Sequence, residues 1–272
     1  MLQQAAASPV ALAFDRMAAD YDTIFTFSAV GRSQRDVIWK QLLSVFAPGS
    51  HILELNCGTG QDARFMARAG MTVTACDASP RMIEQARHRM AVENPEGNLE
   101  FFTLATEHLD ALPATRPFDG LFSNFSGLNC VRDLRNVARL AAQRLKERAP
   151  LLLCLSTRFC LWEIAYFLLR GHPRKALRRC FGVSEARFGE LCFPVYYPTL
   201  SQVRRAFAPE FRLISTAGVG IAVPPSYLES WVKDHSQLLR RMEAVDERIR
   251  RWPLLRVLGD HMLLHLERAH EC

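Results

Sequence analysis

Residues 51–87 of the chain, HILELNCGTGQDARFMARAGMTVTACDASPRMIEQAR, decide the fold. The first apolar run, 51–56, ends abruptly at the glycine-rich CGTG, as is typical of a buried strand that enters a tight turn. Residues 61–70 predict a helix that closes with a glycine. MTVTAC (71–76) then predicts a second strand, and DASPRMIEQAR (77–87) begins a second helix.

The same alternation continues up to Ser156. LEFFTL (99–104), FDGLFSNF (118–125) and PLLLCLS (150–156) are strand-like, and residues 131–146 have the apolar spacing of an amphipathic helix. Strands and helices that take turns along a chain predict an α/β fold, in which helices cover both faces of a mostly parallel sheet.

The pattern changes after Ser156. Residues 158–182 predict a helix, a break at Gly171-His172-Pro173 and a short basic helix. LCFPVYYPTL (191–200) contains two prolines, so a loop or an edge strand fits it better than a central strand. The remaining segments predict, in order, a short helix, a strand, one long polar-faced helix and a last strand: 201–210, 211–221, 227–252 and 260–268.

These patterns divide the chain into four parts. We expect an N-terminal helical lid segment over 1–47, a cofactor-binding core over 48–158, a cap insertion that contacts the substrate over 159–200, and a C-terminal part that completes the sheet over 201–272.

The composition is that of an ordinary globular protein, with 49% hydrophobic and 23% charged residues among 272. The N-terminus lacks the pattern of a secretory signal, and no apolar run reaches the roughly 20 residues that cross a bilayer. We therefore expect a soluble, cytoplasmic protein. The eight cysteines form no CxxC pair and no Cys/His ligand spacing, so we expect reduced thiols and no metal site.

The net charge of +6 comes from local basic clusters at 172–179, 203–207 and 248–252. Such clusters are typical of solvated helix faces, and they also suit an anionic partner such as a lipid headgroup or a nucleic acid. The apolar 161–169 followed by the basic 174–179 fits a lipid-like acceptor or peripheral membrane contact. It fits equally a cap helix packed on the sheet with its arginines in water.

Chemistry is indicated at the turn after the first strand. Gly58 and Gly60 stand where the chain turns sharply, and without a Cβ they let a ligand lie against the backbone. Asp77 ends the second strand, and ligands of open α/β sheets bind beyond the carboxyl ends of the strands. A carboxylate at that point can accept hydrogen bonds from both hydroxyls of a ribose.

ELNCGTG together with TACDASPRMIEQAR resembles the class I S-adenosylmethionine (SAM) dependent methyltransferases, and most of all their small-molecule type. The resemblance covers residues 35–160 and implies a Rossmann-like, seven-stranded, mostly parallel sheet with SAM as cofactor. It implies that Glu54 supports the loop and the methionine part of SAM, that Asp77 holds the ribose, and that Ala78 and Met82 line the adenine pocket. The cofactor residues that it implies are Tyr21, Glu54, Asn56, Gly58, Gly60, Asp77, Ala78, Met82, Thr106, Glu107, Asn124 and Phe125.

Because the sequence departs from the family pattern at some positions, it does not identify the methyl acceptor. Thr106 occupies the place of the usual adenine-side acid, with Glu107 beside it, and the Asn-Pro-Pro-Tyr motif of amino-group nucleic-acid methyltransferases is absent. We expect a small, apolar acceptor and no nucleic acid, with the oligomeric state undetermined. The candidate catalytic side chains are His108, His261 and Tyr196, and each of them also fits a purely structural role.

Three alternatives remain. Gly58, Gly60 and Ala63 with a later acid also satisfy the nicotinamide-dinucleotide pattern, although Glu54 inside the strand and the helical segment before it favour SAM. The basic surface suits an RNA- or protein-directed methyltransferase. The same binding residues also suit a SAM-binding subunit without turnover.

Overall fold

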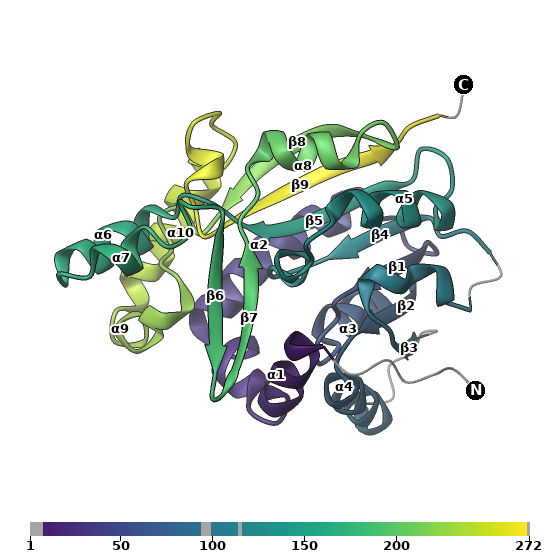
Figure 1. The fold of residues 1–272 in the computed structure, drawn as a ribbon, viewed down its shortest axis with the longest axis horizontal. Coiled ribbons are helices and arrows are strands. Elements are labelled where there is room, and N and C mark those ends of the chain that lie inside the picture. Colours follow the sequence, from purple (N-terminus) through teal and green to yellow (C-terminus); the bar gives the residue numbers. More distant parts are fainter. Residues whose placement is uncertain (1–7, 94–98, 114–115, 271–272) are drawn as a thin grey trace.

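The computed structural model describes residues 8–93, 99–113 and 116–270. A seven-stranded sheet has the order β3-β2-β1-β4-β5-β9-β8 (Figure 1). Strands β1 to β5 are parallel, and β9 runs antiparallel to its neighbours β5 and β8 in this sheet. This confirms the Rossmann-like, mostly parallel sheet. The strands are β1 (His51–Leu55), β2 (Thr72–Asp77), β3 (Leu99–Thr103), β4 (Gly120–Ser123), β5 (Pro150–Ser156), β8 (Phe211–Val219) and β9 (His261–Arg268).

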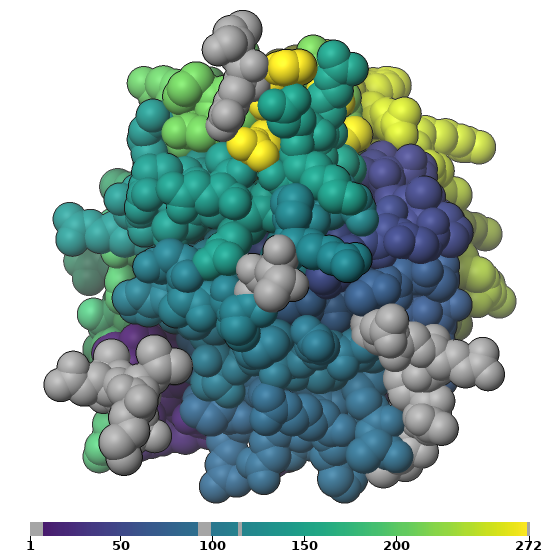
Figure 2. Space-filling model, turned by 90° about the vertical axis from the view of Figure 1, so that its right-hand side faces the viewer, coloured from purple at the N-terminus to yellow at the C-terminus, as the bar shows by residue number. Residues whose placement is uncertain are grey.

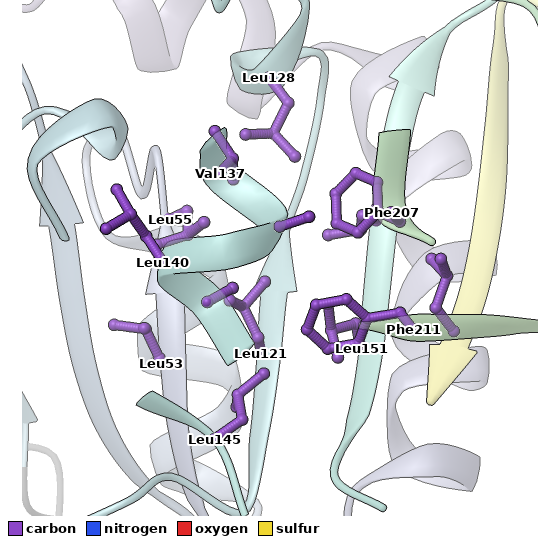
Figure 3. Close-up of a cluster of buried hydrophobic side chains, with 14 of the residues drawn as sticks. Leu53, Leu55, Leu121, Leu128, Val137, Leu140, Leu145, Leu151, Phe207 and Phe211 are labelled. Atoms are coloured by element: carbon purple, nitrogen blue, oxygen red, sulfur yellow. The ribbon is translucent and has the colours of Figure 1, made fainter. Parts of the chain in front are cut away.

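Helices cover both faces of the sheet, as the alternation predicts. On one face, α5 (Leu134–Arg144) and α8 (Leu200–Phe207) pack on leucines of β1, β4 and β5, and Figure 3 shows this cluster. On the other face lie α2 (Ala29–Val45), α3 (Gln61–Arg68) and α4 (Pro80–Glu93). Apolar side chains at helical spacing face the sheet because removing them from water is the main favourable contribution to folding.

The N-terminal segment adds α1 (Pro9–Met17) and the π-helical turn η1 (Asp22–Thr26). Helix α1 contacts α4 and strand β7, and it therefore bridges the core and the insertion (Figure 1). Short 3-10 turns follow β3 and β4 at η2 (Thr106–Ala111) and η3 (Gly127–Cys130).

The insertion after β5 consists of two parts. Helices α6 (Leu161–Leu169) and α7 (Pro173–Ala176) confirm the predicted helix, its break and the short basic helix, and Gly171 in the break has a φ of 72°. A separate antiparallel hairpin follows, with β6 (Val183–Phe188) and β7 (Leu191–Tyr196). Strand β7 contains Pro194 and lies at the edge of a two-stranded sheet, as the prolines of 191–200 indicate, whereas β6 did not stand out in the sequence.

The expectation of one long helix over 227–252 is wrong. The chain forms η4 (Ser226–Leu228), α9 (Glu229–Asp234) and α10 (Ser236–Ile249), with a non-helical break at His235 (φ −127°, ψ 44°). The Glu229 carboxylate accepts hydrogen bonds from the backbone N–H groups of Ala29 and Val30 at 2.7 and 3.0 Å, at the N-terminus of α2. This cap and the burial of Val232 hold α9 against α2, and α10 begins after the break. A last turn, η5 (Leu255–Val257), leads into β9.

Figure 2 views the molecule from the end opposite α6 and α7 and shows side chains of the core and of the C-terminal segments on this face. Within the described ranges no helix has both the length and the apolar character needed to cross a membrane.

Candidate functional site

A cavity of about 430 Å³ lies at the carboxyl edge of β1, β2 and β4, beneath α1 and η1. Most of the residues that the sequence assigned to a cofactor line it: Tyr21, Asn56, Gly58, Asp77, Ala78, Met82, Thr106, Glu107, Asn124 and Phe125. Glu54 and Gly60 do not reach its surface. The topology brings these residues together because parallel strands end at the same edge of the sheet.

The turn after β1 shows why two glycines stand there. Gly58 has a φ of 55° and Gly60 a φ of 75°, in the left-handed region that favours glycine. A Cβ on Gly60 would lie 3.0 Å from the Cβ of Ala86, so this glycine permits close packing of the turn on α4. A Cβ on Gly58 would meet only the Tyr21 ring, at 3.9 Å, so its open side faces the cavity.

The Asp77 carboxylate is held in one orientation at the end of β2. Its Oδ2 accepts from the Gly58 N–H at 2.9 Å and its Oδ1 from the Ser79 N–H at 2.8 Å. Burial raises the pKa of Asp77, and these two donors oppose the rise. Each oxygen keeps a further lone pair, so the group can accept two more hydrogen bonds from a ligand with adjacent hydroxyls.

A buried ion pair forms another wall of the cavity. The Asp62 carboxylate accepts from Arg35 Nε at 3.0 Å, from Trp39 Nε1 at 2.7 Å and from Asn124 Nδ2 at 2.9 Å. The Arg35 guanidinium also lies 4.7 Å from the centre of the Phe125 ring. Both partners of the ion pair line the cavity, so this wall carries a fixed positive group with a compensating carboxylate.

Sequence reasoning missed Arg35, Asp62 and Thr26, which all line the cavity. One signal was available for Arg35, since it shares the apolar helical face of Ile38 and Leu42 in α2. A charged residue on a buried face needs a partner, and that requirement indicates a buried ion pair. No local pattern indicates Thr26, whose buried Oγ1 has no hydrogen-bond partner within the described ranges.

Hydrogen bonds of two carboxylates hold the N-terminal segment over the cavity. Asp15 of α1 accepts from Ser79 Oγ at 2.6 Å and from the Arg81 N–H at 3.0 Å, and both donors lie in the segment that follows Asp77. Asp22 of η1 accepts from Thr59 Oγ1 at 2.7 Å in the glycine turn and pairs with Arg89. Between them Tyr21 lines the cavity, and burial raises the pKa of its hydroxyl to about 12. We call residues 9–26 the lid.

Glu54 lies in the interior below the turn. Burial, with the nearby carboxylates of Asp62 and Asp77, raises the pKa of Glu54 well above its usual range, and Arg35 opposes the shift. Its Oε2 is buried without a hydrogen-bond partner in the part of the chain that the structure describes. A carboxyl in this state is an acceptor that a nearby cationic ligand would favour in its charged form.

The three candidate catalytic side chains occupy different places. His108 lines the cavity from an exposed position at its rim, beside the exposed Glu107. His261 is buried behind Phe125, with the two rings edge to face and their centroids 5.6 Å apart. Tyr196 does not line the cavity, and its backbone carbonyl accepts from Asn129 Nδ2 at 2.5 Å.

Comparison with known proteins agrees with this geometry. A family described as "Methyltransferase domain" matches residues 52–148. The chain is 39% identical over 87 residues to a malonyl-[acyl-carrier protein] O-methyltransferase of Serratia marcescens, covering 31% of each chain. It is 30% identical over 148 residues to a demethylmenaquinone methyltransferase of Tropheryma whipplei, covering 52% of this chain and 56% of that protein.

Among solved structures, the fold is similar to that of magnesium protoporphyrin IX methyltransferase from Synechocystis with bound SAH (S-adenosylhomocysteine). The TM-score is 0.58 at 13% identity, over 96% of this chain and 98% of that one. Residues 52–148 thus match the methyltransferase-domain family, and the fold is similar to that of solved S-adenosylmethionine-dependent methyltransferases. In sequence, the chain spans about a third to a half of the length of the curated relatives it matches.

Proposed function

We propose that the protein is a SAM-dependent methyltransferase that acts on a small, apolar organic acceptor. The observation that carries this proposal is the orientation of Asp77 by the N–H groups of Gly58 and Ser79, beside the glycine turn in the wall of the cavity. Asp77 would hold the two ribose hydroxyls, with the open side of Gly58 beneath the cofactor.

The opposite wall suits the amino-acid part of SAM. Arg35 and the unpartnered Thr26 hydroxyl are a cation and a hydrogen-bond donor for a carboxylate. Glu54 lies behind the cavity wall, below the glycine turn, and its buried carboxyl would support the turn beneath an ammonium group. Thr106, Ala78 and Met82 form the side of the cavity suited to an adenine ring, and Met82 is buried there. When bound, SAM supplies an electrophilic methyl group and leaves as SAH.

The aromatic walls support an apolar acceptor. Phe14, Tyr21, Phe25 and Phe125 form a chain of rings whose neighbouring centroids lie 4.9–6.5 Å apart. Phe14, Tyr21 and Phe125 line the cavity. Curated relatives named for a quinone and for malonyl-acyl carrier protein agree with a small organic acceptor.

Proton removal sets a limit on the acceptor. The one histidine among the described lining residues is the exposed His108, and His261 stands behind Phe125. An acceptor that ionises readily, such as a carboxylate or an acidic hydroxyl, needs little general-base help, and this site suits it better than an aliphatic alcohol.

Calorimetric titration with SAM, SAH and NADH tests the cofactor assignment. We expect binding of the two sulfur compounds and none of NADH, because the ribose and amino-acid ends both find partners in the cavity. Transfer of labelled methyl from SAM to a panel of hydroquinones and acyl carboxylates then tests turnover. Binding of NADH without SAM would contradict the proposal. SAM binding without transfer to any panel member would favour a subunit without turnover.

The lid contacts predict slow release of the cofactor. In the double variant Asp15→Asn/Asp22→Asn, we expect SAH to dissociate about tenfold faster, because hydrogen bonds to a charged group contribute about 1.5–3 kcal/mol each. Stopped-flow displacement of SAH measures this rate. Asp20→Asn is the matched control on the same segment, since its exposed side chain should leave the rate unchanged. Equal rates in all three proteins would show that the lid does not retain the cofactor.

A further inference from the structure

The α6–α7 turn forms a projecting, partly apolar tip. Figure 1 shows the two helices at one end of the molecule, away from the seven-stranded sheet. We define the cap tip as residues 168–175. Its Leu169 is 88% exposed and its Leu168 is 49% exposed, side by side at the end of α6. Two adjacent leucines at a projecting turn expose a contiguous apolar surface to water, and such a surface indicates contact with an apolar phase.

The charge of the cap tip has one sign. Arg170, Arg174 and Lys175 lie on it, and the sequence has no acidic residue from 164 to 184. The preceding acid, Glu163, is buried, and its oxygens accept from Arg178 at 2.7 Å and Arg179 at 3.0 Å. Glu163 therefore does not neutralise the tip.

Aromatic side chains lie directly behind the tip. Tyr166, Phe167 and Tyr227 pack with ring centroids 5.1–5.7 Å apart and are partly exposed. The Arg170 guanidinium lies 4.6 Å from the Tyr166 ring centre, and Lys175 Nζ lies 5.9 Å from that of Phe167. Apolar residues at the tip, aromatic rings behind them and cations around them match the layers of a lipid headgroup region.

We propose that the cap tip inserts its two leucines into an anionic lipid surface. A second copy of this chain docked through the same patch would bring like charges together. A nucleic acid would leave Leu168 and Leu169 without an apolar partner. An anionic bilayer satisfies both features, since basic residues near such a surface and buried apolar side chains each favour binding. The inference does not depend on the cofactor.

Vesicle co-sedimentation of the full chain, without SAM, tests the proposal. We expect binding to phosphatidylcholine vesicles that contain phosphatidylglycerol, and weak binding to phosphatidylcholine alone. Leu168→Asp/Leu169→Asp and Arg174→Glu/Lys175→Glu should each weaken binding about tenfold or more. The control variants, Leu43→Asp/Ile214→Asp on α2 and β8 and Arg204→Glu/Arg205→Glu on α8, make equal changes of charge on exposed residues elsewhere and should bind like the wild type.

None of these residues lines the cavity, so a folded variant should still bind SAH. Circular dichroism and SAH titration of each variant therefore establish that it is folded. Three results would overturn the proposal: no binding to anionic vesicles, binding that survives the leucine variant, or a loss in the control variants equal to that in the tip variants. Loss of vesicle binding with retained SAH binding leaves the proposed function intact, so the two proposals fail separately.

Discussion

Asp77→Ala is expected to weaken the binding of both SAM and SAH at least a hundredfold. The carboxylate is positioned to accept two hydrogen bonds from a ribose, and hydrogen bonds to a charged group contribute about 1.5–3 kcal/mol each. Losing both corresponds to about two orders of magnitude or more in Kd. The substitution also removes the acceptor for the Gly58 and Ser79 N–H groups, which loosens the turn. Isothermal titration calorimetry with SAH measures the change.

Glu107→Gln is the matched control for this variant. Glu107 lines the same cavity but is exposed at its rim, so solvent screens its interaction with a ligand and we expect a change of about threefold or less. If Asp77→Ala binds SAH within fivefold of the wild type, the ribose assignment is wrong.

Arg35→Ala is expected to lower the free energy of unfolding by about 3 kcal/mol or more. Removing one partner of a buried ion pair typically costs about 3–5 kcal/mol, because the remaining charge is left in the interior. Here Asp62 would keep its bonds from Trp39 and Asn124 but lose its counter-charge. Urea unfolding followed by circular dichroism measures the change.

Arg32→Ala on the same helix is the control for this variant. The Arg32 side chain is exposed and bonds only the Phe27 carbonyl among its described contacts, so we expect a loss below about 1 kcal/mol. The double variant Arg35→Ala/Asp62→Asn should lose less than the sum of its parts, since it removes both charges. Two results would exclude a strong ion pair between Arg35 and Asp62. The double variant could lose as much free energy of unfolding as its two single variants together, or Arg35→Ala could be as stable as Arg32→Ala.

The architecture of the core was predictable from local patterns. Short apolar runs that alternate with amphipathic helices indicated five of the parallel strands, and the structure confirms them as β1 to β5. Gly58 and Asp77 belong to the motif that resembles the family, and in the sequence each lies at the end of a strand or just after it. Their place at the cavity follows from the topology of any such sheet.

Elsewhere, distant contacts overrode the local pattern. The segment 227–252 has the periodicity of one helix, but Glu229 caps α2, which lies about 200 residues earlier, and the helix breaks at His235. The sequence makes His261 and Tyr196 candidate catalytic side chains, and the structure places neither of them at the cavity wall.

The sequence by itself determined the alternation of strands and helices, the glycine turn after β1 and the acid at the end of β2, because each depends on neighbouring residues and backbone geometry. Only the tertiary structure decided that Arg35, Asp62 and Asn124 meet, and that Asp22 and Asp15 of residues 9–26 accept hydrogen bonds from Thr59 and Ser79. These contacts join segments 27–64 residues apart. Their pairing depends on how the helices pack on the sheet, and no local pattern encodes that packing.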